Sequence, residues 1–358
     1  MITNQQILDT LDFYGCPCDL IQSRQAGQFT DYFISPLNGT TIKKLQNRET
    51  DFSFALGCPV SVILDNYNII LRIQNRERPF YDLFDYLHHV RERKNGNILM
   101  GLTPTGGGVF ESIDDMPHLL VAGSTGSGKS VFMHNAIVCL SMSPVVFTMI
   151  DLKRVELSIY NNMPFMSCPV INDARGAVSA LMHEVNEMES RYKLMQRENV
   201  RNYKQLSKPL AARVIVIDEL ADLMLNRETR KDIEFCIVKI AQLGRAAGMH
   251  LIVATQRPDT TVITGLIKAN IPARLAFRTS SAIDSRVIGV KGAETLTGKG
   301  DGLYLSTTYT NPERVQACNV PDDTLQKFVD AVKEKVRQEK QRPQPQKARR
   351  GFFTRLFG

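Results

Sequence analysis

Apolar runs and helical spacings alternate along the chain from residue 116 onward. Five short apolar runs predict buried strands, at 118–122, 145–151, 214–217, 251–254 and 273–277. Three stretches with amphipathic spacing predict helices between them, at 131–138, 175–196 and 230–244. Regular alternation of strands and helices is typical of an α/β fold with a parallel sheet.

The first 95 or so residues follow a mixed pattern. Thr3, followed by Gln6, predicts a capping box at the start of a helix that runs to residue 14. Period-two and helical patterns then predict strands at 18–23, 30–35, 60–64 and 68–73 and helices at 42–56 and 82–93. This pattern indicates a small α+β unit.

A stretch rich in Gly and Thr, residues 95–108, predicts a turn and a domain boundary. Beyond the alternating region, two strands are expected at 302–305 and 314–320, followed by a charged helix. We therefore expect four segments: a small α+β domain over 1–97, a large α/β domain over 98–322, a helix over 323–341, and a linker with a basic-aromatic tail over 342–358.

Composition narrows the class of protein. A hydrophobic fraction of 43% and a charged fraction of 23% are ordinary for a globular protein. No apolar run approaches the ~18–20 residues that cross a bilayer, and the first residues lack the pattern of a secretory signal. Seven cysteines without a C-x-x-C pair indicate reduced thiols rather than disulfides or zinc. We therefore expect a cytoplasmic protein.

The net charge of +7 is concentrated at one end of the chain. Residues 331–358 hold nine Lys or Arg and two Asp or Glu, whereas the other residues hold 35 of each sign. A path for DNA in the body of the protein would therefore depend on the local placement of Lys and Arg, or on several subunits that line one channel.

A phosphate-binding loop is predicted at 123–130, which matches G-x-x-x-x-G-K-S between a strand and a helix. Its backbone N–H groups would hold phosphate oxygens, Lys129 would reach the β- and γ-phosphates of ATP, and Ser130 would offer its hydroxyl to Mg²⁺. An accidental Gly/Ser loop is disfavoured by the strand and helix around it. The predicted nucleotide-binding residues are Gly123, Ser124, Thr125, Gly126, Ser127, Gly128, Lys129, Ser130 and Val131.

Acidic and polar residues follow two of the other predicted strands. Asp218 is placed to hold the Mg²⁺ shell, and Glu219 to orient an attacking water. Thr255 and Gln256 end the next strand, where they would contact the γ-phosphate or its water, or else only form a turn started by Pro258. The charges of the helix at 175–196, which include Glu184 and Arg191, are expected to form a solvated face.

Several strings are more specific than these generic motifs. They are MPHLLVAGSTGSGKS, IDLKRVELSIYNNMPFM, VIVIDELADLM, GRAAGMHLIVATQRPDTTVITGLIKANIPAR and SSAIDSRVIG. Together they resemble the motor domain of the FtsK/SpoIIIE family of DNA translocases, over about residues 98–320. The resemblance implies a RecA-like P-loop NTPase fold, a homo-hexameric ring around double-stranded DNA, and hydrolysis of ATP with Mg²⁺ at subunit interfaces.

The resemblance also implies roles for individual residues. Lys129 and Ser130 match the Walker A pair, Asp218 and Glu219 match the Walker B pair, and Gln256 matches the family's polar sensor. Ser130 and Asp218 are thereby the expected ligands of the metal.

Basic residues near the end of the motor would serve the neighbouring subunit and the DNA. Arg274 is the first choice for the arginine inserted into a neighbour's site, and Arg286 is the alternative. Arg286, Lys268, Lys291 and Lys299 are the expected contacts with DNA phosphates, although a surface salt bridge is the simpler interpretation of Arg286.

The chain departs from the family's pattern at both ends. It shows no membrane-spanning N-terminal region and too few residues after 320 for a C-terminal winged-helix domain, which puts sequence-directed polarity in doubt. Alternative functions are a type VII protein-secretion motor, a viral genome-packaging ATPase and a nucleotide-dependent scaffold. The Asp218-Glu219 pair disfavours the scaffold, which has no need to orient water.

The tail, KARRGFFTRLFG at 347–358, leaves three interpretations open. It would be a solvated end, a peptide that docks on a partner, or a weak hold on an anionic membrane. The last would make the protein peripheral at the membrane.

Overall fold

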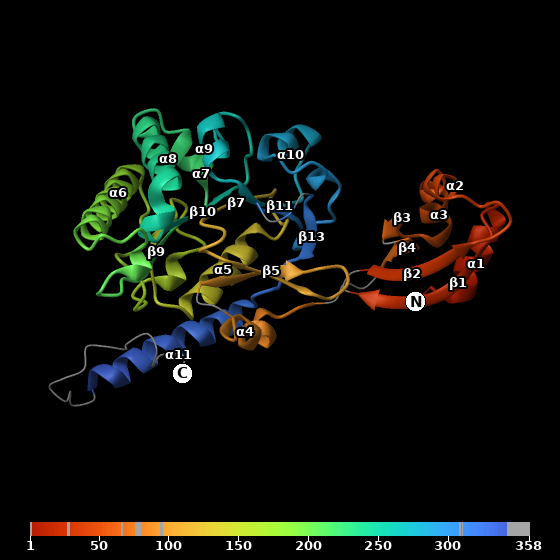
Figure 1. Cartoon of the computed structure of the whole chain (residues 1–358), viewed down its shortest axis with the longest axis horizontal. Helices are drawn as coiled ribbons and strands as arrows, with labels where there is room; N and C mark the ends of the chain where they lie inside the picture. Colours follow the sequence, from red (N-terminus) through yellow and green to blue (C-terminus); the bar gives the residue numbers. More distant parts are fainter. Residues whose placement is uncertain are drawn as a thin grey trace. The chain divides into compact units, whose positions relative to one another are not determined.

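The computed structural model describes residues 2–26, 29–65, 67–75, 80–93, 96–307, 309 and 311–341. Its contacts divide the chain into two units. The smaller unit comprises Met1–Phe80 and Leu102–Gly108, and the larger comprises Tyr81–Gly101 and Val109–Gly358. Figure 1 labels most of the helices and strands of both units and colours them along the sequence. The predicted linker and tail at 342–358 lie outside the described residues.

The smaller unit contains a four-stranded antiparallel sheet of order β1-β2-β4-β3. Its strands are β1 (Cys18–Ala26), β2 (Phe29–Pro36), β3 (Val60–Asp65) and β4 (Asn68–Gln74). Its helices are α1 (Asn4–Phe13), α2 (Ile42–Gln46) and α3 (Glu49–Leu56), whose apolar side chains share one core with the sheet. Thr3 and Gln6 form the predicted capping box at the start of α1.

The prediction of a single helix over 42–56 is wrong, because the structure has two helices there. The first helix ends at Gln46, and the second begins after Arg48. Glu49, in the first turn of α3, accepts a hydrogen bond of 2.7 Å from the backbone N–H of Val62. This contact ties the start of α3 to β3, a tertiary constraint that helical periodicity does not contain.

The larger unit is built on a nine-stranded sheet of order β6-β5-β13-β12-β11-β7-β10-β9-β8. Its strands are β5 (Asn97–Leu102), β6 (Gly108–Ser112), β7 (His118–Ala122), β8 (Val145–Ile150), β9 (Ala212–Ile217), β10 (Met249–Thr255), β11 (Ala273–Phe277), β12 (Asp301–Leu305) and β13 (Glu313–Gln316). The five strands from β7 to β11 are parallel neighbours, and their chain order across the sheet is 5-1-4-3-2. The predicted α/β fold of the RecA-like P-loop type is confirmed.

Helices cover both faces of this sheet (Figure 1) because its central strands are apolar on both sides. On β7, Leu119 and Val121 face one core cluster and Leu120 faces the other. The first cluster includes residues of α4 (Leu83–Arg91), α5 (Lys129–Ser141) and α11 (Asp322–Gln341). The second includes residues of α6 (Ala174–Arg197), α7 (Leu220–Met224), α8 (Arg230–Ala247), α9 (Gly265–Asn270) and α10 (Ala282–Ile288). In the described part of the chain, short 3₁₀ helices at Ser158–Tyr160, Tyr203–Gln205 and Ala293–Thr295 complete the connections.

The stretch predicted as a boundary loop, 95–108, contains strand β5. Ile98, Leu99 and Met100 are fully buried in the main sheet. The sequence prediction gave weight to the Gly and Thr residues that follow and overlooked this short apolar run. The contact boundary lies at Phe80, so α4, which falls inside the predicted first segment 1–97, packs with the larger unit.

The prediction that the charges of α6 form a solvated face is wrong for two of them. Glu184 is buried and accepts two hydrogen bonds of 2.6 Å from Arg213. Arg191 is also buried and donates to the backbone carbonyls of Ala211 and Ala247. Arg191 also pairs with Glu187 at 2.9 Å, so each buried charge has both hydrogen bonds and an opposite charge, which is the condition for burying it.

All seven cysteines are free thiols in the structure. Among the described residues, no helix combines the length and the apolar character that a membrane span requires.

Candidate nucleotide-binding site

The predicted phosphate-binding loop lies between β7 and α5, at the carboxyl edge of the parallel strands. Gly126 and Gly128 have φ angles of 74° and 115°, in the region that favours glycine. A Cβ atom on Gly128 would lie 2.6 Å from the backbone nitrogen of Gly300, so a side chain has no room there. Gly128 precedes the first residue of α5, and the loop therefore ends at a helix N-terminus, where anions are favoured.

Three neighbouring segments hold this loop in place. The N–H and the hydroxyl of Ser124 both donate to the carbonyl of Arg278, which follows β11, at 2.9 Å. Thr125 donates its hydroxyl hydrogen to Gln256, after β10, at 3.0 Å. Ser127 accepts a hydrogen bond of 2.7 Å at its carbonyl from the N–H of Gly300. The loop conformation is therefore fixed by contacts far away in sequence.

Lys129 points at the acidic end of β9. Its ammonium group is 3% exposed and donates to the carbonyl of Asp218 at 2.7 Å and to the Asp218 carboxylate at 3.0 Å. This pairing is possible because β10 lies between β7 and β9 and aligns their carboxyl ends. Lys129 and Asp218 thus form a buried ion pair.

The residues at this edge fit a complex of Mg²⁺ with a nucleotide. The hydroxyl of Ser130 and the carboxylate of Asp218 are oxygen donors of the kind that Mg²⁺ prefers. The hydroxyl of Ser127 is buried in the loop without a hydrogen-bond partner. An unsatisfied buried hydroxyl inside a phosphate-binding loop fits an anion that supplies the missing contact.

Glu219 is held against the end of β10. Its Oε1 accepts a hydrogen bond of 2.7 Å from the hydroxyl of Thr255, and the N–H of Gln256 lies 3.0–3.1 Å from both carboxylate oxygens. Thr255 and Gln256 therefore do more than form a turn: Thr255 anchors Glu219, and the Gln256 side chain contacts Thr125 of the loop. Lys153, which the sequence analysis missed, lies 4.0 Å from Glu219 and 3.7 Å from Asp222.

Arg274 is packed inside the larger unit, away from the phosphate-binding loop. It lies three residues before the end of β11, whereas the loop contacts Arg278 beyond that end. Its guanidinium group donates to the carbonyl of Lys268 at 3.0 Å, and its Nε is buried without a hydrogen-bond partner. Burial lowers the pKa of Arg274. The structure therefore gives this side chain an intramolecular packing role.

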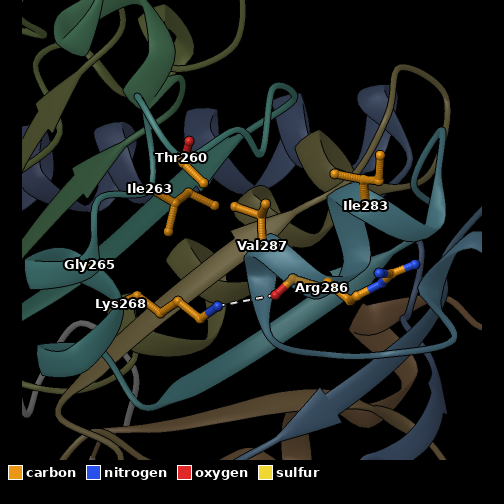
Figure 2. Close-up of a pocket in the computed structure, with 7 residues that line it drawn as sticks. All are labelled: Thr260, Ile263, Gly265, Lys268, Ile283, Arg286 and Val287. Atoms are coloured by element: carbon orange, nitrogen blue, oxygen red, sulfur yellow. Dashed lines mark hydrogen bonds between the residues drawn. The ribbon is translucent and has the colours of Figure 1, made fainter.

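The predicted DNA-contacting cations do not form one cluster. Lys268 and Arg286 line a pocket of about 370 Å³ between α9 and α10, together with Thr260, Ile263, Gly265, Ile283 and Val287. Figure 2 shows the Lys268 ammonium donating to the carbonyl of Arg286, at 3.1 Å, while the Arg286 guanidinium extends away from it. Lys291 is exposed after α10, and Lys299 is exposed beside the phosphate-binding loop with a φ of 52°.

Several residues at the site carry no generic motif and escaped the sequence analysis. Lys153 and Glu156 follow β8, and Arg278 follows β11. Lys153 and Glu156 lie inside IDLKRVELSIYNNMPFM, a string that resembles the family's motor but contains no generic motif that marks either residue. Asp151, Lys153 and Val155 are spaced two residues apart, as in an extended segment. The sequence therefore does not indicate that this loop folds back toward the phosphate-binding loop.

Comparisons with known proteins show which family the chain matches. The model of the FtsK/SpoIIIE family matches residues 87–213 and 204–260. The DNA translocase FtsK of Clostridium tetani is 39% identical in an alignment of 348 positions that covers 91% of this chain and 47% of the relative. The DNA translocase SpoIIIE of Bacillus subtilis is 38% identical in an alignment of 349 positions that covers 90% of this chain and 44% of the relative. The chain thus spans about half the length of the curated relatives it matches.

Solved structures support the same fold. The conjugation coupling protein TcpA of pCW3, in its monomer form with ATPγS, has a TM-score of 0.68 and 24% identity, over 93% of this chain and 99% of that chain. The cytoplasmic domain of the type VII secretion ATPase EccC of Thermomonospora curvata has a TM-score of 0.56 and 22% identity, over 72% of this chain and 32% of that chain. At these identities the likeness shows the fold alone.

Proposed function

The chain belongs to the FtsK/SpoIIIE family, and we propose that it is an ATP-driven motor that translocates double-stranded DNA. The main support is that the strand-end residues needed for ATP hydrolysis converge at one edge of the sheet. Lys129 contacts Asp218, and Glu219 contacts the end of β10. The named relatives are DNA translocases, and their similarity extends over about nine tenths of the chain.

The chemistry follows from these contacts. The loop N–H groups and the positive charge of Lys129 bind the phosphates of ATP, which requires Lys129 to exchange Asp218 for the nucleotide. Ser130 and Asp218 would hold Mg²⁺, which when bound neutralises charge on the β- and γ-phosphate oxygens. Glu219 orients the attacking water, and its anchor on Thr255 limits the positions that its carboxylate can take.

The remaining parts of the proposal concern assembly and DNA. We assign Lys268, Arg286, Lys291 and Lys299 to DNA phosphates in a homo-hexameric ring that works in the cytoplasm. Arg274 can serve a neighbour's site only if its guanidinium leaves Lys268, whereas Arg286 already extends from the surface. A trans-acting arginine must reach across an interface, so the two residues are competing assignments.

ATP turnover with and without linear double-stranded DNA tests the proposed function. We expect DNA to stimulate turnover, and the protein to displace a bound roadblock, such as a triplex-forming strand, from duplex DNA in an ATP-dependent way. Lys129→Ala is the matched control and should abolish both, because positioning and charge supply most of the catalysis of phosphoryl transfer. ATP turnover that is indifferent to DNA, with no roadblock displaced, would reject a DNA translocase and favour a secretion motor.

A further inference from the structure

The loop that follows β8 is fixed by a single buried carboxylate. Asp151 is 1% exposed and accepts four backbone hydrogen bonds, each of 3.0 Å. One oxygen takes the N–H groups of Lys153 and Arg154, and the other takes those of Glu156 and Leu157. Because the carboxylate caps the loop at both ends, the position of Glu156 is set by the end of a core strand.

This loop directs Glu156 toward the first turns of α5. Glu156 Oε2 lies 3.6 Å from Nε2 of His134, and Nδ1 of His134 lies 2.9 Å from the hydroxyl of the fully buried Tyr160. Ser130 is four residues before His134, so both side chains project from the same face of α5. The Ser130 hydroxyl is also near enough to Glu156 to help lower the pKa of its carboxylate.

The electrostatic environment keeps Glu156 in its charged form. The contact with His134 lowers the pKa of Glu156 most; burial opposes this effect, and Ser130 and the nearby Lys129 charge add to it. The side chain is about one third exposed, so water still reaches it. An anionic acceptor is thus available beside the serine of the phosphate-binding loop.

The geometry has a consequence for the Ser130 hydroxyl. A serine hydroxyl has one hydrogen and two lone pairs, and a cation can bind only at a lone pair. The hydrogen must then point at an acceptor on the other side. Glu156 can supply such an acceptor, because its carboxylate lies beside His134, on the face of α5 that carries Ser130, and close enough to Ser130 for the hydroxyl to influence its pKa. Glu156 belongs to neither the Walker A nor the Walker B motif.

We propose that Glu156 is a positioning residue of the magnesium–nucleotide site, which orients the Ser130 hydroxyl by accepting its hydrogen. His134 holds the carboxylate in place, and Tyr160 holds His134. The inference rests on the proposed function, since it needs a bound nucleotide, and it assigns a role to a residue that the two Walker motifs leave out. Groups of this kind, which orient a metal ligand, typically contribute 10–100-fold in metal affinity.

The test measures how nucleotide binding depends on Mg²⁺, without relying on turnover. A fluorescent, slowly hydrolysed ATP analogue is titrated into wild type, Glu156→Gln and Glu156→Ala at a series of Mg²⁺ concentrations and in EDTA. In EDTA the three proteins should bind the analogue equally. Mg²⁺ should raise the affinity for the analogue, and the Mg²⁺ concentration that gives half of this increase should be about 10–100-fold higher in Glu156→Ala than in wild type. It should rise less in Glu156→Gln, whose amide oxygen still accepts a hydrogen bond.

Two further variants separate positioning from a structural role. Glu228→Gln removes an exposed carboxylate that pairs with Arg175 and should behave as wild type. If Glu156 acts through Ser130, then Glu156→Ala should add less than about 2-fold to the Mg²⁺ requirement of Ser130→Ala.

Three results would overturn the inference. They are an unchanged Mg²⁺ requirement in Glu156→Ala, an equal loss of affinity in EDTA and in Mg²⁺, and full additivity with Ser130→Ala. A wild-type protein that binds no nucleotide at any Mg²⁺ concentration would instead reject the proposed function, and the inference with it.

Discussion

Two buried histidines should make the larger unit sensitive to acid. His118 and His250 lie near the amino ends of the neighbouring strands β7 and β10 and are 2% and 1% exposed. Burial lowers the pKa of His118 to about 3 and that of His250 to about 4. Nδ1 of His118 accepts a hydrogen bond from the N–H of Leu251, so this ring is neutral, and neither Nε2 has a hydrogen-bond partner.

The size of the effect follows from proton linkage. In the unfolded chain each imidazole takes up a proton near pH 6.5, whereas in the folded chain it stays neutral down to about pH 3–4. The unfolded state therefore binds more protons below pH 6.5, and the free energy of unfolding falls as the pH falls. Between pH 7.5 and pH 5 the loss is about 2 kcal/mol for each histidine, and about 4 kcal/mol for the pair.

Urea unfolding at pH 7.5 and pH 5 measures this loss. His250→Gln should reduce the difference between the two pH values by about 2 kcal/mol, whatever its effect on absolute stability. His183→Gln, which changes an exposed histidine of α6, is the matched control and should leave the difference as in wild type. If His250→Gln and His183→Gln show the same pH dependence, then His250 is not kept neutral by burial and the reasoning is wrong.

Three further predictions concern the proposed motor. Glu219→Gln should bind ATP but hydrolyse it slowly, because an amide cannot take a proton from the attacking water; turnover at the wild-type rate would remove that role. If Arg274 acts across an interface, Arg274→Ala should lower turnover of the assembled protein on the order of 10³-fold or more, and mixing with Lys129→Ala should restore part of it. If mixing with Lys129→Ala restores turnover to Arg286→Ala but not to Arg274→Ala, the trans-acting arginine is Arg286. Deletion of 343–358 should leave DNA-stimulated turnover nearly unchanged and abolish recruitment in the cell, whereas a collapse of turnover in the purified truncation would assign the tail to the motor.

The parallel core was predictable because its signals are local. The strands β7 to β11 are short apolar runs, and glycines with a lysine in fixed spacing mark the phosphate-binding loop. Asp218 and Glu219 were found because they end a buried strand. For these residues the chain order and the parallel topology together determine which strand ends meet.

The parts that were missed depend on tertiary contacts. Glu184 looks like any surface charge of an amphipathic helix until Arg213, on another element, is placed beside it. Glu156 reaches α5 only because Asp151 folds the intervening loop. Arg274 looks like a free interface residue in sequence, yet its guanidinium is packed under the carbonyl of Lys268. Hydrophobic periodicity carries no information about such pairings.

The contact between Ser127 and Gly300 joins the nucleotide loop to the segment that carries Lys299. It is made by backbone atoms alone, and the close approach of Gly128 leaves no space for a side chain between the two loops. Apart from Gly300→Pro, which would remove the N–H donor, a substitution cannot delete this hydrogen bond directly, and a displacement of one loop is needed to break it. If the Ser127 carbonyl moves when phosphate enters, either Gly300 moves with it or the hydrogen bond between them breaks. The main chain therefore couples the position of the nucleotide loop to the position of the segment that carries Lys299.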